Sequence, residues 1–466
     1  MRPDSLNALS ALAGLATPAS GQVEITGNDP VFPTPYRVGE AGAAAIGAAA
    51  YAAAEIWRLR SGRRQCVAVD VRAAAASLKS ARYLKVNGET PAGPWDPLSG
   101  FYPVREGRWV SIHCNFPNHR DAAVKVLGTP VEREAAMTAS VNWDGLELED
   151  AIHAAGGCAG LARTAAEWSQ HPQEAAVAAQ PLFEILRIGD APPEPFPSGR
   201  RPLEGVRVLD LTRVLAGPSC ARLLAEHGAE VLKITAPHLP DSGMFELDTG
   251  IGKRAAHLDL RNPAAVATLR ELARTADVFS QSYRPGALAS RGFSFEELAR
   301  LRPGIVCLDL SAWGASGPWS ARRGFDTIVQ AVSGMALAMG DGSKPKYLPV
   351  SAIDYVSGAL MALGAMAALL RRATEGGSWL VRLSLARTGR WITDQGAIST
   401  GMLRGVPDEL PAEELARITM ETESPAGRIL HLRPVALLSE TPGRWTLPPA
   451  PLGHDPAAWG NDNETK

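Results

Sequence analysis

The chain has 466 residues, a formal net charge of −2, and 45% hydrophobic and 21% charged residues. This length exceeds what one hydrophobic core usually organises, so a folded protein of two or three domains is expected. The near-neutral charge provides no general field for nucleic acid or for an acidic membrane. The five cysteines are scattered and the nine histidines form no metal-binding motif, which argues against a disulfide scaffold and against a metal site.

Two apolar stretches near the N-terminus are candidates for targeting or membrane segments. Residues 1–21 are interrupted by Asp4 and Asn7, unlike the apolar centre of a signal peptide. Residues 41–57 are mostly alanine and glycine and include Glu55, which favours a buried amphipathic helix over a membrane span. A cytoplasmic protein without a membrane partner is therefore expected.

Breaks rich in proline and glycine divide the chain. The clearest is DAPPEPFPSGRRP, residues 190–202, a composition typical of an extended linker. The sequence predicts an N-terminal segment 1–97, a small mixed α/β domain 98–190, a linker 191–202, a large domain 203–405 and an irregular tail 406–466.

The large domain shows alternating strand and helix patterns. GVRVLDL (205–211) is a short apolar strand, Pro218 suits the first position of a helix, and Gly228 suits its end. AEVLKI (229–234) follows as the next strand, and the alternation continues. This spacing predicts an α/β fold with a Rossmann-like parallel sheet.

Residues 38–78 are similar to residues 353–392. Both ranges combine a helix of small residues, a basic helix end, a glycine turn and a strand, and their alignment pairs Gly62 with Gly376 and Glu40 with Asp354. Alanine-rich helices resemble one another easily, so coincidence is the alternative. A partial internal duplication is the favoured interpretation.

Several motifs in the large domain carry a family resemblance. They are LEGVRVLDLTRVLAGP (203–218), GAEVLKI (228–234), GKRAAHLDL (252–260), ADVFSQSYRPGAL (276–288), LSAWGASGP (310–318), GFDTIVQAVSGMA (324–336) and the later VSAIDYVSGAL. Together and in this order they resemble the class III (CaiB/BaiF-type) CoA-transferase family. The resemblance implies a Rossmann-like large domain with a smaller mixed α/β domain, and an interlocked homodimer.

The domain order departs from that family. EGRWVSIHCNFPNHRDAAVKVLG and RTAAEWSQHPQ resemble the family's small domain, but here they precede the large domain. Residues 1–97 resemble a partial copy of the later part of a large domain. This order leaves two assemblies open, an interlocked homodimer and an internal pseudo-dimer.

The resemblance implies transfer of CoA from an acyl-CoA to a carboxylic acid, with CoA as substrate and no permanently bound cofactor. Asp354 matches the family's nucleophile, which forms a mixed anhydride and then an aspartyl-CoA thioester. From the reference pKa of about 3.9, Asp354 is expected to be ionised at neutral pH without a separate base. The alternative role for Asp354 is a helix N-cap.

Other positions are candidates for the pocket and for CoA binding. Gln330, Ala331 and Gly334 match the family's Q-A-x-x-G pocket wall, and Phe325 precedes them. Gly340 and Gly342 are candidates for a loop facing the reacting carbonyl, with a plain β-turn as the alternative. The candidate CoA-binding cations, with solvated surface charges as the alternative, are Arg213, Lys253, Arg254, Arg284 and Arg323. Thr235 and Ala236 replace an acidic and a basic residue that the family usually places there.

Three other functions are alternatives. An acyl-CoA racemase or epimerase of the same superfamily would carry a histidine where this chain has Phe325, and phenylalanine cannot exchange a proton. A non-catalytic CoA-binding subunit is suggested by the duplication and by Glu40 at the aspartate-equivalent position. A dehydrogenase lacks support because no G-x-G-x-x-G fingerprint is present.

Overall fold

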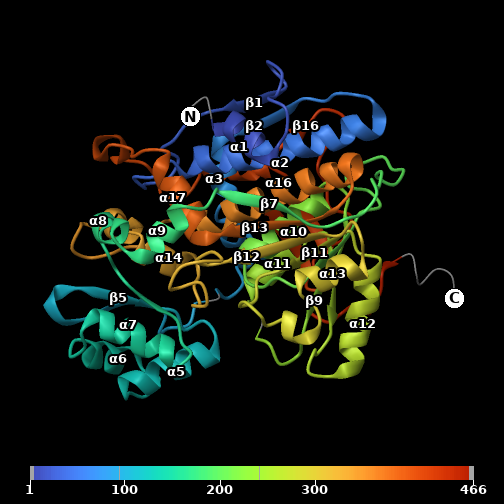
Figure 1. Ribbon diagram of the computed structural model, residues 1–466. Coiled ribbons are helices and arrows are strands. Elements are labelled where there is room, and N and C mark those ends of the chain that lie inside the picture. The colour runs from blue at the N-terminus through green and yellow to red at the C-terminus, as the bar shows by residue number, and fades with distance from the viewer. Residues whose placement is uncertain (1–4, 94, 241, 461–466) are drawn as a thin grey trace.

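The computed structural model describes residues 5–93, 95–240 and 242–460 and has an α/β architecture (Figure 1). Its centre is a seven-stranded sheet in the order β10-β9-β8-β11-β12-β13-β7. All neighbours pair in parallel except β13 and β7, which are antiparallel. The strands are β7 (Phe183–Gly189), β8 (Arg207–Asp210), β9 (Glu230–Thr235), β10 (Lys253–His257), β11 (Val278–Gln281), β12 (Val306–Ser311) and β13 (Ser378–Ser384). The predicted Rossmann-like sheet is confirmed.

Both faces of this sheet are buried, as is usual for parallel sheets. Val208, Val278 and Val306 belong to one core, while their neighbours Leu209, Phe279 and Cys307 belong to the other. The first core includes side chains of the helices at residues 216–226 and 352–375. The second includes side chains of the helices at residues 263–274 and 295–301. The helices of the large domain are α10 (Ala216–Glu226), α11 (Met244–Thr249), α12 (Pro263–Arg274), η2 (Ala289–Arg291), α13 (Phe295–Leu301), α14 (Asp326–Val332), α15 (Met335–Met339), α16 (Ala352–Glu375), α17 (Leu385–Asp394) and η3 (Thr400–Leu403).

The small domain has its own core beside the large sheet (Figure 1). Its three strands form an antiparallel sheet in the order β4-β5-β6. Its elements are β4 (Gly100–Pro103), η1 (Arg105–Gly107), β5 (Trp109–Ile112), α5 (Pro117–Leu127), α6 (Arg133–Ser140), α7 (Gly145–Ala154) and β6 (Ala159–Leu161), followed by α8 (Ala165–Ser169) and α9 (Pro172–Ala178). Strand β7 falls within the range expected for this domain but pairs with β13 of the large sheet.

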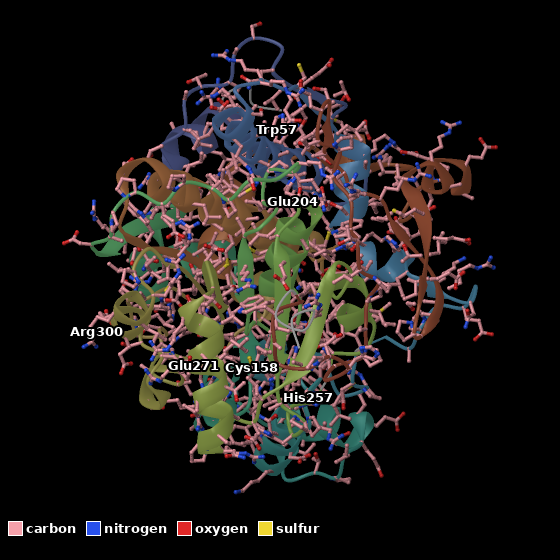
Figure 2. All side chains as sticks on the ribbon, turned by 90° about the vertical axis from the view of Figure 1, so that its right-hand side faces the viewer. Trp57, Cys158, Glu204, His257, Glu271 and Arg300 are labelled. Carbon is pink, nitrogen blue, oxygen red and sulfur yellow. The ribbon has the colours of Figure 1, made fainter. Side chains whose placement is uncertain are left out.

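The N-terminal segment and the small domain lie at opposite ends of the central strands. Figure 2 shows the segment around Trp57 above the central strands and the small-domain helices below them. Its elements are α1 (Ser5–Ala13), β1 (Val23–Thr26), α2 (Val38–Ser61), β2 (Val67–Asp70), α3 (Val71–Ser77), α4 (Ser80–Tyr83) and β3 (Lys85–Val86). Helix α2 packs against α16, and each has 24 residues.

Small residues in α16 allow close helix packing. A side chain added at Gly358 would place its Cβ 2.7 Å from the carbonyl oxygen of Ala216 in α10. Among the described residues, α16 is the one helix long and apolar enough to cross a membrane, but 89% of its most apolar window is buried inside the protein. It is a core helix of this fold.

The two similar stretches of sequence have the same strand arrangement. Strand β1 pairs in parallel with β2, as β12 does with β13. Strand β16 (Leu437–Leu438) pairs antiparallel with β2, as β7 does with β13. The N-terminal copy therefore receives its antiparallel edge strand, β16, from the segment after the second copy. The second copy receives its edge strand, β7, from the segment after the first copy.

The segment 406–466 was expected to be irregular, and that expectation is wrong for its described part. It contains α18 (Ala412–Ile418), β14 (Thr419–Ser424), β15 (Gly427–Leu432) and β16. Strand β15 pairs with β3 of the N-terminal segment. Trp459 is buried in the core that α12 and α13 cover. Strands that are distant in the sequence hold this segment in place. Its regular structure could therefore not be predicted from its local composition.

Candidate active site

Two aspartates meet where α14 and α16 begin. The backbone N–H of Asp354, in the first turn of α16, donates to Oδ2 of Asp326 over 3.0 Å. Gln330 donates to Oδ1 of Asp326, and its own Oε1 accepts the backbone N–H of Leu348 over 2.9 Å. Ser351 is the N-cap residue of α16, so Asp354 does not serve as the cap. Gln330 acts here by holding Asp326.

The surroundings of the aspartate pair disfavour two negative charges. Burial, and then the charge of Asp326, raise the pKa of Asp354 well above its usual value. Burial raises the pKa of Asp326 to about 6, against the lowering effect of the hydrogen bonds from Asp354 and Gln330. The expectation that Asp354 ionises at its reference pKa is therefore wrong. The N-terminus of α16 favours a carboxylate, but the pair titrates as a unit.

A cavity of about 520 Å³ reaches Asp354 from the carboxyl ends of β8, β11 and β12; we call it the arginine cavity. Ligands of open parallel sheets usually bind at this edge. Three of the predicted CoA-binding cations line it, namely Arg213, Arg284 and Arg323. Within the described chain, Arg284 and Arg323 form no ion pair. Burial, followed by the charge of Arg284, lowers the pKa of Arg323.

A second cavity of about 330 Å³, here the outer cavity, adjoins the arginine cavity and shares His238, Leu239, Tyr283 and Ala287 with it. It lies where β9 and β10 end, and Thr235 and Ala236 form part of its wall. Arg261 and Arg291 also line it.

The other two predicted cations lie elsewhere. Lys253 is buried, pairs with Asp210 over 2.9 Å and donates to the carbonyl of Pro218 over 2.7 Å. Arg254 pairs with Glu230 over 3.3 Å. Neither lines the arginine cavity or the outer cavity.

The remaining predicted pocket residues lie at the junction with the small domain or on the surface. Ala331 accepts the backbone N–H of Arg163 over 3.2 Å. Gly334 has φ 89°, and a Cβ there would lie 2.5 Å from the backbone nitrogen of Ala165. Gly340 and Gly342 flank the exposed Asp341, which accepts the backbone N–H groups of Ser343 and Lys344. This is a turn, and it lies outside the lining of the arginine cavity.

The small domain contributes residues that the sequence did not reveal. The ring of Phe325 stacks on His113, with centroids 3.8 Å apart and planes 5° from parallel. Phe116 and His119 pack around the same ring and line the arginine cavity. Burial lowers the pKa of His113 to about 3 and that of His119 to about 4. Both histidines are neutral at pH 7.

A third space lies on the Asp326 side of the pair. It joins a cavity of about 290 Å³, lined by Asp326, to one of about 300 Å³, and the two share Arg82, Trp95 and Ser351. We call the two together the rear cavity. Asp354 lines the arginine cavity, whereas Asp326 and Ser351 line the rear cavity. The start of α16 therefore separates them.

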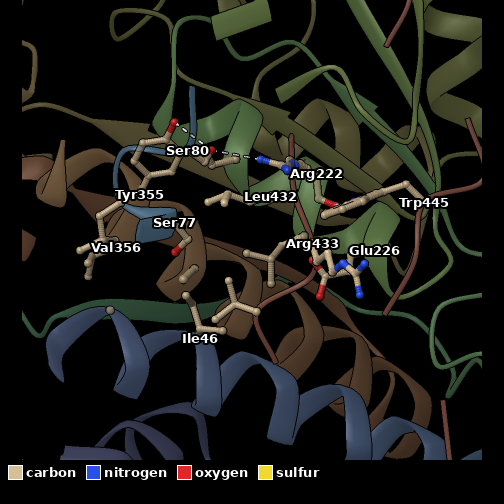
Figure 3. Close-up of a pocket in the computed structure, with 16 residues that line it drawn as sticks. Ile46, Ser77, Ser80, Arg222, Glu226, Tyr355, Val356, Leu432, Arg433 and Trp445 are labelled. Carbon is tan, nitrogen blue, oxygen red and sulfur yellow. Dashed lines mark hydrogen bonds between the residues drawn. The ribbon is translucent and has the colours of Figure 1, made fainter. Parts of the chain in front are cut away.

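A further cavity of about 70 Å³ lies between α2, α10, α16 and the C-terminal segment (Figure 3). In Figure 3, Ser80, Arg222 and Tyr355 lie on one side of it and Ile46 of α2 on the other. Tyr355 and Val356 follow Asp354 in the chain and line this cavity, and Tyr355 also lines the rear cavity. Across the described residues, no group of three or more His, Cys, Asp or Glu side chains is placed to hold a metal ion.

Residues 6–192 and 203–419 match CoA-transferase family III, and the chain belongs to this family. The two matched segments are consistent with the duplicated order. The chain is 29% identical over 324 residues to an acetyl-coenzyme A transferase, nodX, of Hypoxylon pulicicidum, covering 63% of this chain and 54% of that protein. It is 35% identical over 189 residues to the succinyl-CoA:glutarate CoA-transferase of Mus musculus, covering 38% of this chain and 43% of that protein.

A crystal structure of Rv3272 from M. tuberculosis is 30% identical, with a TM-score of 0.40, and the match covers 42% of this chain and 59% of that one. The chain spans about half the length of the curated relatives it matches.

Proposed function

We propose that this protein is a CoA-transferase that moves CoA from an acyl-CoA to a carboxylic acid, with Asp354 as nucleophile. The observation that carries the proposal is that a cavity lined by Arg213, Arg284 and Arg323 ends at Asp354. Family membership and the relatives' names, acetyl-coenzyme A transferase and succinyl-CoA:glutarate CoA-transferase, support it.

We assign the CoA molecule to the arginine cavity and the outer cavity, which share four wall residues. Arginines bind phosphate oxygens through charged hydrogen bonds, so Arg284 and Arg323 are assigned to the phosphates. The outer cavity offers Arg261 and Arg291 at its wall. Arg261, which pairs with Asp259 over 2.6 Å, and Arg291 are candidates to take the place of the basic residue that the family has where this chain has Ala236.

The reaction needs only carboxylate and thioester chemistry. A carboxylate oxygen of Asp354 attacks the thioester carbon, the C–S bond breaks, and CoA leaves as a thiolate, which gives a mixed anhydride. The thiolate then attacks the Asp354 carbonyl and releases the first acid as a carboxylate. The carboxylate of the second acid attacks the aspartyl carbonyl, the C–S bond of the aspartyl-CoA thioester breaks, and a second mixed anhydride and CoA thiolate form. The thiolate then attacks the carbonyl of the second acid in that anhydride, which gives the new acyl-CoA and releases Asp354 as a carboxylate. No electron or additional group is consumed.

The raised pKa of Asp354 matters for this first step. One negative charge shared by Asp354 and Asp326 is the state that burial favours, and a weakly solvated carboxylate is the more reactive nucleophile. The positive charge of Arg82, in the rear cavity, lowers the pKa of Asp326 and so favours that charge.

Racemase chemistry is disfavoured by the surroundings of Phe325. Its ring stacks on His113, which is buried and neutral. An acid/base pair across the substrate would need an ionisable group at this position.

We also propose that the interlocked arrangement implied for a homodimer forms within this single chain. The exchanged edge strands, β7 on β13 and β16 on β2, favour this internal pair.

The test is mass spectrometry after incubation with a panel of acyl-CoA thioesters, followed by trapping with hydroxylamine or borohydride. A CoA adduct or trapped product at Asp354 is expected, and it is absent from Asp354→Ala. Asp121→Ala, at an exposed carboxylate on the small domain, is the matched control and should behave as wild type. CoA binding without any adduct in the wild type would overturn the transferase proposal and favour a non-catalytic CoA-binding subunit.

A further inference from the structure

The turn between β8 and α10 forms part of the wall of the arginine cavity. Val214, Leu215 and Ala216 line this cavity, as does Asp354. Leu215 and Ala216 are buried, and across the described residues their backbone N–H groups donate to no acceptor. Buried backbone N–H groups without a partner are rare in folded proteins. Two adjacent ones at the wall of a cavity therefore indicate donors for a bound molecule.

The backbone conformation of the turn brings these two donors together. Val214 has φ 70°, in the left-handed region that β-branched residues rarely adopt, and Leu215 has φ −137°. A change in the sign of φ between neighbouring residues turns successive N–H groups toward one side, which makes a small concavity for an anionic oxygen. Ala216 then begins the first turn of α10, so the positive end of the helix dipole lies at the same point.

Buried polar contacts hold this turn in place. A conformation such as that of Val214 persists where the surrounding structure fixes it. Asp210 accepts the backbone N–H of Thr212 over 3.0 Å. The Lys253 ammonium binds Asp210 over 2.9 Å and the carbonyl oxygen of Pro218 over 2.7 Å. Lys253 thus ties the end of β8 to the first turn of α10, and the two free N–H groups lie between these points.

Helix packing brings Asp354 close to the turn. Gly358 lies one helical turn after Asp354 in α16, and a Cβ at Gly358 would lie 2.7 Å from the carbonyl oxygen of Ala216. Residues four positions apart share a face of a helix, so Asp354 lies on the face of α16 that packs on the start of α10. The Asp354 carboxylate is buried and, within the described chain, accepts no hydrogen bond. The carboxylate and the N–H groups line one cavity without bonding each other, so a reacting carbonyl can lie between them.

We propose, on the basis of the CoA-transfer function above, that the N–H groups of Leu215 and Ala216 form an oxyanion hole. When the Asp354 carboxylate attacks the thioester carbon, an electron pair of the carbonyl double bond moves to its oxygen, and the two N–H groups donate to that oxyanion. The double bond forms again as the C–S bond breaks and the CoA thiolate leaves. The donors are neither consumed nor deprotonated. Fixed donors of this kind stabilise the charge that develops in the transition state.

Free N–H groups at a helix start can also be bound by water alone, and that alternative has a different signature. Hydration would give the two N–H groups a part in the stability of α10 but none in the rate of the chemical step. An oxyanion hole binds the transition state more strongly than the thioester. Its loss therefore lowers the rate and leaves the affinity for CoA unchanged.

The experiment replaces Ala216 by lactic acid, which puts an ester oxygen in the place of the Ala216 N–H and keeps the methyl side chain. Adduct formation at Asp354 is followed in single turnovers with a saturating acyl-CoA that labels the wild type. The rate is expected to fall about 100-fold or more, the loss typical of one oxyanion donor. Kd for CoA, which has no thioester carbonyl, should stay unchanged.

Ala412→lactic acid is the matched control. Ala412 is the first residue of α18, as Ala216 is of α10, and its N–H also has no acceptor in the part of the chain that the structure describes. In both helices the carbonyl before the ester accepts an N–H from the first turn, so the ester weakens the same kind of bond. The control should keep the wild-type rate. A rate in Ala216→lactic acid that falls no further than in the control overturns the proposal.

Infrared spectroscopy of bound acetyl-CoA, labelled with ¹³C at the thioester carbonyl, tests the hole without the chemistry. In Asp354→Asn, which cannot form the adduct, the carbonyl stretch should lie at lower wavenumber than in free acetyl-CoA, because hydrogen bonds weaken the double bond. The shift should shrink when Ala216 is also replaced by lactic acid. This result supports the hole even if no adduct forms in the wild type, in which case only the proposed function fails. A stretch equal to that of free acetyl-CoA, or a shift that the ester leaves unchanged, overturns the proposal.

Discussion

The backbone N–H of Asp354 donates to Oδ2 of Asp326 over 3.0 Å. The same contact fixes the start of α16 and brings two buried carboxyl groups together. Asp326 therefore positions the proposed nucleophile and also raises its pKa. One residue couples the geometry of the site to its protonation.

The N-terminal copy repeats this relationship. The backbone N–H of Glu40, in the first turn of α2, donates to Oδ2 of Asp29 over 2.8 Å. Burial raises the pKa of Asp29 to about 6, as it does for Asp326. Arg37 pairs with Glu40 over 3.2 Å, and neither Asp29 nor Glu40 lines the arginine cavity or the rear cavity. The N-terminal copy therefore keeps the hydrogen bond between the helix start and a buried aspartate. The arginine cavity and the rear cavity lie beside Asp354 and Asp326 instead.

The pKa of the aspartate pair predicts the pH dependence of adduct formation. Asp354 must lose its proton to attack, and its pKa is raised, so the rate of adduct formation should rise with pH and be low on the acid side. Asp326→Asn removes a negative charge while keeping an acceptor for the Asp354 N–H, so the rise should move to lower pH. Single-turnover rates with one acyl-CoA between pH 4 and pH 8, about the range where raised carboxyl pKa values lie, give the profile. Asp341→Asn, in the exposed turn, is the control and should leave the pH profile of adduct formation unchanged. An unchanged profile in Asp326→Asn would contradict the effect of the Asp326 charge on the pKa of Asp354.

Loss of an arginine from the arginine cavity should weaken CoA binding selectively. Arg284→Met removes a cation that forms no ion pair within the described chain, so the fold loses little. A charged hydrogen bond is worth about 1.5–3 kcal/mol, so Kd for CoA should rise roughly 10- to 100-fold. Calorimetric titration with CoA measures Kd, and the thermal midpoint of the free protein should stay near that of wild type. An unchanged Kd would remove Arg284 from the phosphate site.

Lys253 should show the opposite behaviour. It is buried against Asp210, and removing one partner of a buried ion pair costs about 3–5 kcal/mol because the other charge is left uncompensated. Lys253→Met should therefore lower the thermal midpoint strongly. The double variant Lys253→Met, Asp210→Asn should recover part of the stability, which a role in phosphate binding does not predict. Scanning calorimetry of the two variants distinguishes the roles.

The sequence predicted the large sheet because its signals are local. Short apolar strands, Pro218 near the helix start and Gly228 after the helix end describe β8, α10 and β9 within a few residues. Asp354 was chosen from its motif position, and Arg213, Arg284 and Arg323 were chosen because they lie in loops of that sheet. The structure brings all four to the arginine cavity, and their roles stay predictions. The motif position of Lys253 was equally clear, but the buried carboxylate of Asp210 that binds it could not be inferred from spacing.

The other residues of the site could not be predicted, because contacts between segments distant in the sequence bring them there. His113 and His119 belong to the small domain, and nothing in their own surroundings in the sequence indicates that they pack on Phe325. Arg82 and Trp95 lie shortly before the predicted boundary between residues 97 and 98, outside every family motif. Asp326 was closer to prediction, since it follows Phe325 in a recognised motif, but its hydrogen bond to Asp354 joins residues 28 positions apart.

Gly334 should be required for docking of the small domain. Gly334 and Gly342 have nearly the same positive φ, 89° and 87°, but a Cβ at Gly334 would lie 2.5 Å from the Ala165 nitrogen, whereas one at Gly342 meets nothing within 4 Å. Alanine at either position incurs a left-handed backbone cost of about 1–2 kcal/mol. Gly334→Ala adds the clash and should lower the thermal midpoint further than Gly342→Ala. Equal midpoints in the two variants would show that the junction adapts to the added methyl group.

The exchange of edge strands predicts the mass of the protein in solution. Strand β7, which follows the small domain, completes the sheet at β13, and β16 completes the smaller sheet at β2. Because each sheet takes its antiparallel edge from within the same chain, a second chain is not needed to supply these strands. Light scattering on a size-exclusion column should therefore give the mass of one chain, 49.3 kDa, across a wide concentration range. A stable particle of twice that mass at the lowest concentrations would favour an interlocked homodimer, with the strands exchanged between chains. Cysteine pairs placed across β16 and β2 would then crosslink two chains, whereas the internal exchange gives a crosslink within one.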